Sequence, residues 1–396
     1  MNRKEKSNRF ENHPKKTLVI FLALVILALG YGAEKFLQYK HHGAGFNYAL
    51  PNRAVALREW RPGMINWELP GKSARTSDSL TLKPYLLRID RNGFIIPSKK
   101  YDHPDITLAF LGASTTECRY VEEGHRFPYL AGALLEKNLG IQINSYNAAR
   151  SGNHSLHSLI VFLAKVLPLR PDIVIMMHNA NDLAILLHDQ TYWNNKSSRP
   201  MIVDMNKEIS SNFIRYYRDK WIPHLAEAMR DFDRRVRLWL TSGKKPGLQP
   251  EEDEFAQYRG KKVVVDESKL VPPFTKNLQT FIAICKSQGI TPVLMTMANR
   301  LKDNPDPAVI AEFKGRDIGY REFKAAFDRF NEVIRQTGRE NHLLVIDLAN
   351  KIPPQKEYLY DIIHLNDNGS VKAAEIISRQ LEPLVRQKLQ PQGSVH

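Results

Sequence analysis

The sequence predicts an α/β domain built on a five-stranded parallel sheet with helices on both faces. Two observations lead to this fold class: short apolar runs rich in branched residues follow Asp105, and helical patterns lie between most of them. Apolar runs of this length and composition are typical of buried strands. Strands that alternate with helices form a parallel sheet covered on both faces. The five runs are residues 106–112, 141–149, 172–180, 292–298 and 343–349.

The helical segments have recognisable ends. The segment 127–139 has Pro128 near its start, where the missing N–H of proline costs a helix nothing. The segment 274–289 ends at Gly289, a residue type that is common just past the last turn of a helix. A third periodic segment, 371–385, follows the last strand. These segments supply helices that can cover the predicted sheet.

The 396 residues divide into segments of different character. Residues 34–100 are rich in Pro, Gly and aromatic residues without sustained periodicity, which predicts a linker and an irregular lead-in packed on the main domain. Residues 101–396 are expected to form that domain, with a helical insertion at about 183–262. The insertion is interpreted as amphipathic helices packed on the domain, with a membrane-lying or lid role as the alternative. Its apolar residues at helical spacing are Ile209, Phe213, Ile214, Tyr217, Trp221 and Leu225.

The N-terminus carries a membrane signal. Residues 1–16 are polar and mostly basic, and residues 17–33 carry no charge. The uncharged run is just long enough to cross a membrane and longer than the apolar part of most signal peptides. The basic leader favours a retained signal anchor, with cleavage after Gly30 or Gly32 as the alternative. The positive-inside rule then predicts a single-pass inner-membrane protein with residues 1–16 in the cytoplasm and residue 40 onward in the periplasm or outside the cell. The positive charges before the run are Lys4, Lys6, Arg9, Lys15 and Lys16.

The net charge of +15 indicates partners of negative charge. An exported basic protein is attracted to anionic membrane surfaces or anionic polymers. Nucleic acid is not expected as a partner, because no RNA- or DNA-binding motif accompanies the charge and the chain carries an export signal.

The cysteines and histidines give no sign of a disulfide scaffold or a metal site. Cys118 and Cys285 are the only cysteines, and their positions do not say whether they pair. Cys118 is interpreted as a small buried apolar residue. The spacing of four histidines matches no closed zinc motif, so loop or rim positions are expected for them, and no metal or other cofactor is expected. These histidines are His154, His157, His178 and His188, of which His178 is placed where it could contact a substrate.

Three residues predict an activated serine. Ser114 follows the strand 106–112, and in an open parallel sheet ligands bind at the carboxyl ends of the strands. Asp361 and His364 lie near the C-terminus, within one turn of each other. An imidazole can remove the proton of a serine hydroxyl, while a carboxylate on its other nitrogen holds its tautomer and orientation. The sequence therefore predicts Ser114 as nucleophile, His364 as base and Asp361 as the orienting group.

Two further residues are candidates for stabilising an oxyanion. Asn181 follows the strand at 172–180, and an Asn amide can donate to the oxyanion of an acyl-transfer intermediate. Gly152 follows the strand at 141–149, and a glycine can bring its backbone N–H to the same oxyanion without obstruction. Each alone is explained equally well as a turn residue. Because these positions and Ser114 share one rim of the sheet, together they predict one acyl-transfer site.

The order Ser114, Gly152, Asn181 and His364 resembles the four sequence blocks of the SGNH/GDSL hydrolases. The resemblance covers residues 105–369. It implies a three-layer α/β/α fold with a flavodoxin-like sheet in the order 2-1-3-4-5, no metal, and a two-step ester hydrolysis. It also implies an oxyanion hole made of the Ser114 and Gly152 backbone N–H groups and the Asn181 side chain.

Two positions depart from the pattern of that family. Asn179 stands where the third block usually has Gly, which leaves the conformation of the local backbone open. The first block reads Gly-Ala-Ser instead of Gly-Asp-Ser, a replacement that many members share.

The four blocks, the export signal and the basic charge together predict an extracytoplasmic serine esterase. Its expected substrate is a cell-surface carbohydrate or lipid that carries an O-acyl group, with acetyl as the first choice. The same acyl-enzyme can pass its acyl group to a sugar hydroxyl, so an O-acetyltransferase of exopolysaccharide modification is an alternative. A non-catalytic polysaccharide-binding or assembly protein is a third hypothesis. The chain retains Ser114, Asn181, Asp361 and His364, which argues against this hypothesis.

Overall fold

The structure is a computed structural model of the chain. It describes residues 14–42, 53–55, 57–70, 79–193, 200–204, 263–313 and 316–390. Most of the basic tail at 1–16 and the amphipathic helices expected in the insertion lie outside the described residues.

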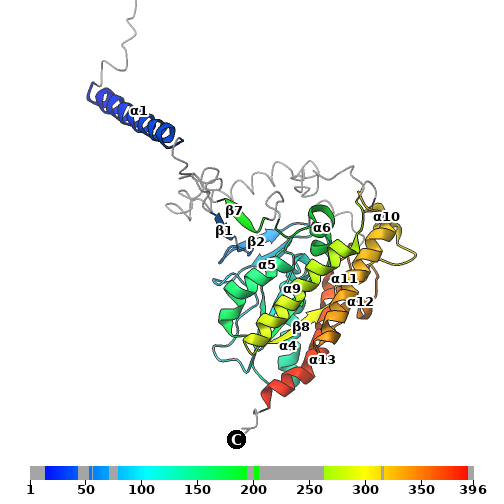
Figure 1. The fold of residues 1–396 in the computed structure, drawn as a ribbon. Helices are drawn as coiled ribbons and strands as arrows, with labels where there is room; N and C mark the ends of the chain where they lie inside the picture. Colours follow the sequence, from blue (N-terminus) through cyan, green and yellow to red (C-terminus); the bar gives the residue numbers. More distant parts are fainter. Residues whose placement is uncertain are drawn as a thin grey trace, which may run out of the picture. The chain divides into compact units, whose positions relative to one another are not determined.

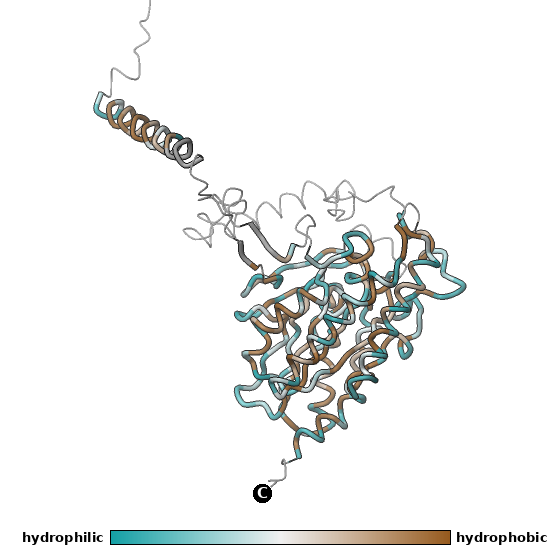
Figure 2. Tube along the Cα trace, in the orientation of Figure 1, coloured by the Kyte–Doolittle hydropathy of each residue, from teal (hydrophilic) through white to brown (hydrophobic). Residues whose placement is uncertain are grey.

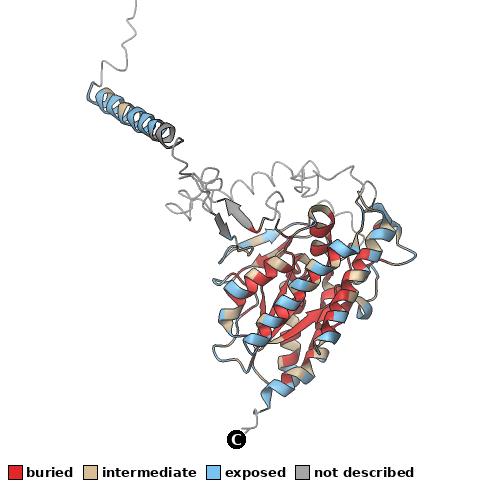
Figure 3. Cartoon of the chain, viewed as in Figure 1, coloured by how far each residue is buried: buried red, intermediate tan, exposed pale blue. Residues whose placement is uncertain are grey.

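The first described element is the helix α1 (Pro14–His42) (Figure 1). Its segment Pro14–Ala33 has 20 residues and is apolar enough to cross a membrane. At 1.5 Å per residue this segment spans about 30 Å, the thickness of a hydrocarbon core. Figure 2 shows its apolar character and Figure 3 its exposure to solvent. The helix expected at 17–33 is therefore present, and both a membrane span and a signal sequence have these properties.

The centre of the domain is a parallel sheet of five strands in the order β5-β4-β6-β8-β9. In chain order this is 2-1-3-4-5, so the expected topology is confirmed. All residues of β4, β5 and β6 are buried, as the continuous apolar runs predict. The strands are β4 (Ile106–Gly112), β5 (Ile143–Asn147), β6 (Ile173–Met177), β8 (Thr291–Met295) and β9 (Val345–Ile346).

Helices cover both faces of this sheet, which confirms the three-layer architecture (Figure 1). One face carries α4 (Phe127–Leu139) and α13 (Asp367–Leu389). The other carries α5 (Ser155–Val161), α9 (Glu267–Ser287) and α11 (Tyr320–Glu340), with α6 (Ala180–Asp189) packed against α9 and α11. The insertion expected from residue 183 thus begins inside α6.

Most helices match the sequence patterns, and α9 is longer than expected. Helix α4 has the predicted bounds and the predicted Pro128 in its first turn. Helix α9 begins at Glu267 because the Asp266 side chain accepts the Ser268 N–H as a cap, and it then continues through Pro272 and Pro273. The shorter elements are α3 (Ser114–Glu117), η1 (Glu123–His125), the π-helical η2 (Phe162–Val166), η3 (Leu167–Leu169), α10 (Pro307–Ala311) and α12 (Leu348–Lys351).

Apolar side chains between the sheet and the helices form the core (Figure 3). Phe274 of α9 and Phe330 of α11 stack with ring centroids 4.5 Å apart. On the other face, the rings of Phe110 of β4 and Phe127 of α4 pack edge to face, with centroids 6.1 Å apart. Each such fully buried side chain contributes about 1.5–3 kcal/mol to stability. The core therefore fixes the strands whose carboxyl ends carry the site.

Residues 57–70 and 79–100 of the lead-in are packed on the domain. Strands β2 (Ile65–Glu68) and β3 (Tyr85–Arg88) form an antiparallel pair, and β1 (Arg53–Val55) pairs with β7 (Ile202–Asp204). The Ile95 N–H donates to the Asn147 carbonyl oxygen at 3.1 Å, so the lead-in covers the edge strand β5. The buried guanidinium of Arg126 donates to carbonyl oxygens of Leu86 and Ile96. These bonds fix the lead-in next to the loops at the carboxyl ends of the strands.

Candidate active site

Ser114 lies at the carboxyl end of the central strand β4, as the first residue of α3. From Leu111 to Cys118 every residue is buried except Ser114, which is partly exposed. Gly112 makes this turn possible, because a Cβ atom there would collide with the Thr116 side chain and lie 3.1 Å from the Met177 carbonyl oxygen. The turn thus presents one hydroxyl to solvent from an otherwise closed core.

Ser114, His364 and Asp361 form a hydrogen-bonded chain. The His364 Nε2 atom lies 2.7 Å from Ser114 Oγ, and its Nδ1 atom lies 2.6 Å from Asp361 Oδ2. The other carboxylate oxygen, Asp361 Oδ1, accepts the backbone N–H groups of Ile363 at 2.9 Å and His364 at 2.7 Å. The carboxylate therefore holds both the imidazole ring and the backbone of its own turn, which is the arrangement that activates a serine.

The loop that carries Asp361 and His364 is fixed by a buried arginine. The Arg300 N–H donates to the Ile362 carbonyl oxygen at 2.8 Å, and its Nη1 donates to the Leu359 carbonyl oxygen at 3.3 Å. Its Nη2 pairs with Asp306 at 3.1 Å. On the other side of His364, the Tyr360 ring stacks nearly parallel to the imidazole, with centroids 5.5 Å apart. Sequence reasoning missed both residues.

The interaction between Asp361 and His364 shifts the pKa of each residue. Burial alone would raise the pKa of Asp361, but attraction to His364 and the hydrogen bonds from His364 and Ile363 lower it below 3.8. Burial alone would lower the pKa of His364, but attraction to Asp361 and their hydrogen bond raise it above 6.5. Asp361 is thus ionised at neutral pH, and His364 is a stronger base than an ordinary histidine.

Gly152 lies in the loop that follows β5, next to the Ser114 turn. Its φ of 81° is in the left-handed region, where a side chain is disfavoured, so glycine is required here by conformation. The preceding Ser151 N–H donates to the buried carboxylate of Glu117, three residues past Ser114. Burial raises the pKa of Glu117, an effect that attraction to Arg119 and the Ser151 N–H partly offset. Glu117 thereby joins the serine turn to the Gly152 loop.

Asn181 lies in the first turn of α6, after β6, and is partly exposed. Its Nδ2 atom donates to the Asn153 carbonyl oxygen at 2.9 Å, which brings its amide next to the Gly152 loop. Strands β5, β4 and β6 are neighbours, so Gly152, Ser114 and Asn181 follow three adjacent strands at one edge of the sheet.

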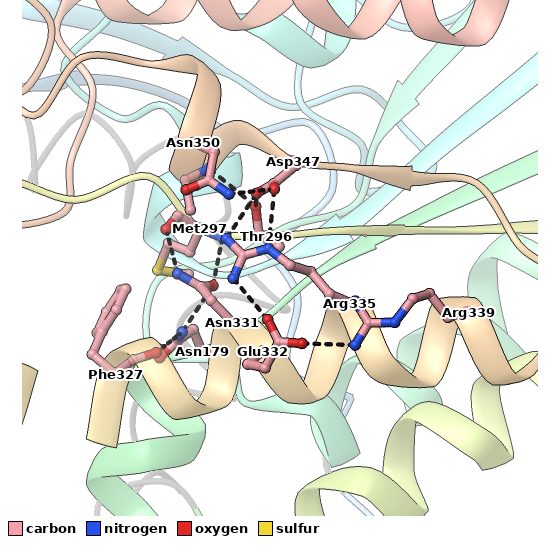
Figure 4. Close-up of polar contacts among 11 residues, drawn as sticks. Asn179, Thr296, Met297, Phe327, Asn331, Glu332, Arg335, Arg339, Asp347 and Asn350 are labelled. Atoms are coloured by element: carbon pink, nitrogen blue, oxygen red, sulfur yellow. Dashed lines mark hydrogen bonds and ion pairs between the residues drawn. The ribbon is translucent and has the colours of Figure 1, made fainter. Parts of the chain in front are cut away.

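Asn179 stands where the family usually has Gly, and this replacement does not disturb the backbone before Asn181. Its φ of −166° lies outside the left-handed region that favours glycine. The buried Asn179 Nδ2 donates to the Phe327 carbonyl oxygen and to Asn331 Oδ1, both at 3.0 Å (Figure 4). Asn331 in turn bonds both backbone groups of Met297, just past β8. The asparagine therefore ties the start of α6 to α11 and to the neighbouring strand.

Two of the four histidines lie in loops, as expected: His154 precedes α5 and His178 follows β6. His157 and His188 lie instead in the helices α5 and α6. His154, His157 and His178 are buried, and the rings of His154 and His157 stack with centroids 3.7 Å apart. His178 Nε2 lies 2.7 Å from Ser158 Oγ inside the core, so its ring does not face solvent. The His154 ring, at the N-cap of α5, also packs against the Tyr192 ring, with centroids 4.9 Å apart.

Both cysteines are buried free thiols. Burial raises the pKa of Cys118 to about 12, in agreement with its interpretation as a small buried residue. Within the described residues, no group of three or more His, Cys, Asp or Glu side chains is arranged to hold a metal ion.

A parallel α/β sheet with a Ser–His–Asp chain at its carboxyl edge is the architecture of a serine hydrolase. Residues 110–371 match the GDSL-like lipase/acylhydrolase family, which is more than half of the chain. The protein belongs to this family and is an enzyme that hydrolyses ester bonds.

Comparison with solved structures finds similar chains at low sequence identity. A lipase/acylhydrolase from Enterococcus faecalis is 16% identical, with 70% of this chain and 96% of that chain covered and a TM-score of 0.40. An acetylxylan esterase from Geobacillus stearothermophilus is 15% identical, with 71% and 94% covered and a TM-score of 0.38. No curated protein matches the sequence. Likenesses of this size say nothing about the substrate of this chain.

Proposed function

We propose that this protein is an extracytoplasmic serine esterase that removes O-acyl groups, acetyl in particular, from a cell-surface carbohydrate or lipid. The observation that carries the proposal is the hydrogen-bonded chain from Ser114 through His364 to Asp361. Its first bond of 2.7 Å is within reach of proton transfer, and the serine is the one partly exposed residue of its turn.

In the first step His364 Nε2 takes the Ser114 proton as the hydroxyl oxygen attacks the ester carbonyl carbon. The resulting imidazolium is stabilised by the ionised Asp361 at 2.6 Å from Nδ1. His364 then gives the proton to the departing alcohol oxygen, which leaves the acyl group on Ser114. Water, deprotonated by His364, then attacks the acyl carbon of this acyl-enzyme. The bond from that carbon to Ser114 Oγ breaks, His364 returns the proton to Ser114, and the free acid leaves.

The oxyanion of each tetrahedral intermediate is assigned to three donors: the backbone N–H groups of Ser114 and Gly152, and the side-chain amide of Asn181. Ser114 is the first residue of a helix, where a backbone N–H has no partner within the helix. The three donors come from loops after adjacent strands. Loss of one such donor typically lowers kcat by about 10²–10³.

The location and substrate class are supported by charge and by α1. Positive charges before the apolar helix favour a cytoplasmic N-terminus and an external catalytic domain. A net charge of +15 draws the exported enzyme to anionic surfaces, where acylated carbohydrates and lipids are found. The serine is partly exposed, so an ester can reach its hydroxyl from solvent.

The test uses the full-length chain in detergent micelles with aryl acetates and an acetylated oligosaccharide. We expect release of free acetate by the wild type and loss of nearly all activity in Ser114→Ala. Activity that survives in Ser114→Ala would overturn the assignment of the nucleophile. Acetyl groups that appear on sugar hydroxyls, with no free acetate, would identify a transferase instead.

A further inference from the structure

The segment 57–60 of the lead-in lies against the loop that carries Gly152. Arg58 Nε donates to Asn153 Oδ1 at 3.1 Å, and Arg58 Nη2 donates to the Ser151 carbonyl oxygen at 3.4 Å. In the opposite direction, Asn153 Nδ2 donates to the Arg58 carbonyl oxygen at 3.3 Å. Gly152 therefore lies between two residues that both bond to Arg58.

The same loop contacts the rest of the proposed oxyanion hole. The Asn153 carbonyl oxygen accepts one N–H of the Asn181 amide at 2.9 Å. Both donors of an amide lie in one plane on the same nitrogen, so this bond also sets the direction of the second N–H. Asn153 thus connects Arg58, which precedes the sheet, to Asn181, which follows β6.

Two neighbouring contacts hold Arg58 in place. Arg150 Nη1 donates to the Glu59 carbonyl oxygen at 2.7 Å. The guanidinium groups of Arg119 and Arg150 both contact the ring of Trp60, at 5.6 Å and 5.5 Å from its centroid. Cation–π contacts of this kind each contribute favourably to packing. The lead-in is therefore anchored to the loop at three consecutive residues.

We propose that Arg58 is a positioning residue of the oxyanion hole, acting through Ser151 and Asn153 on the Gly152 N–H and the Asn181 amide. The proposal rests on the proposed function, because it assigns a role in the same esterase site. Arg58 lies outside residues 110–371, which match the family. The lead-in of this chain thus completes a site whose other parts belong to the family domain.

The physical reason is geometric. The planar guanidinium makes two directed bonds at once, which a point charge does not reproduce. Asn153 is fully buried, so loss of Arg58 leaves its amide oxygen without that donor and lets the loop relax. Oxyanion donors act only within hydrogen-bond distance of the developing charge, and a displacement of about 1 Å can cost about 10²-fold in rate.

The test compares Arg58→Ala and Arg58→Lys with the wild type as full-length proteins in micelles. The matched control is Arg61→Ala, because Arg61 is exposed in the same segment. We expect kcat/KM for an aryl acetate to fall about 10- to 100-fold in Arg58→Ala, less in Arg58→Lys, and not in Arg61→Ala. The inhibition constant of an alkylboronic acid, which mimics the tetrahedral intermediate on Ser114, should rise in parallel, while thermal unfolding stays cooperative.

A double-mutant cycle with Asn181→Ala separates positioning from general stability. If Arg58 acts through Asn181 and its loop, Arg58→Ala has a clearly smaller effect in the Asn181→Ala background than in the wild type. Fully additive losses, or an Arg58→Ala enzyme within twofold of the wild type, overturn the proposal. If Arg58→Ala does not fold, Arg58→Lys replaces it, and the same two results are measured: its activity relative to the wild type and its additivity with Asn181→Ala. A wild type without esterase activity refutes the proposed function instead, so the two failures are distinct.

Discussion

The substitution Asp361→Asn tests the role of the carboxylate with little change in shape. The Asn oxygen can keep the two backbone bonds from Ile363 and His364, at 2.9 Å and 2.7 Å. Its NH₂ group then faces His364 Nδ1, where the carboxylate oxygen lay at 2.6 Å. A donor at this position forces the imidazole proton onto Nε2, opposite Ser114 Oγ, so the ring cannot accept the serine proton.

The expected loss in kcat is about 10³- to 10⁴-fold, or about 4 to 5.5 kcal/mol of transition-state stabilisation. Aryl acetate hydrolysis by full-length protein measures it, with Asp303→Asn as control because that side chain is fully exposed. Without the attraction of Asp361, burial governs His364, so the acid limb of any residual activity should move below pH 6.5. An Asp361→Asn enzyme within tenfold of the wild type would refute the reasoning.

Three further predictions concern pH, the Gly152 loop and the thiols. Because His364 must be neutral to accept the serine proton and its pKa is raised, kcat/KM of the wild type should fall as pH decreases, with a midpoint above 6.5; a midpoint below 6.5 contradicts this. Gly152→Ala should lower stability by about 1–2 kcal/mol in urea unfolding and reduce kcat at least tenfold, whereas Gly140→Ala, also at positive φ, should cost similar stability and leave kcat unchanged. Cys118 and Cys285 should react with a thiol reagent only after unfolding; rapid labelling of the native protein would disprove their burial.

Sequence patterns predicted the fold well, because the apolar runs that indicate strands are also the segments that the core buries. The continuous branched runs become strands buried on both faces, and the strand β4 has the predicted bounds. The pair Asp361 and His364 was accessible to sequence reasoning because both residues lie in one turn. The bond between His364 and Ser114 joins positions 250 residues apart, and only their common edge of the sheet indicates it.

Other parts of the site could not be predicted, because they depend on contacts between distant irregular segments. Arg58 precedes the strands in an aperiodic region and bonds to Asn153, 95 residues later. Arg300 supports the His364 loop mainly through backbone carbonyl groups, which carry no side-chain pattern. Glu117 had a local signal, since it lies one helical turn past Ser114, but a lone acidic residue in a turn has many explanations.

The histidines show the opposite error. His178 follows a strand at the edge that carries the site, so its position in the sequence favoured exposure. In the structure its side chain is buried and lies within hydrogen-bond distance of Ser158 of α5, because helices cover both faces of the sheet at this strand.

The most direct test of the account is to label the nucleophilic serine covalently. The full-length protein is incubated with an alkyl fluorophosphonate, which adds covalently to an activated serine, and its peptides are analysed by mass spectrometry. The account predicts one phosphonyl group on Ser114, with labelling that slows as pH falls through the raised pKa of His364. Labelling of a different serine, or a wild type that labels no faster than Ser114→Ala, would contradict it.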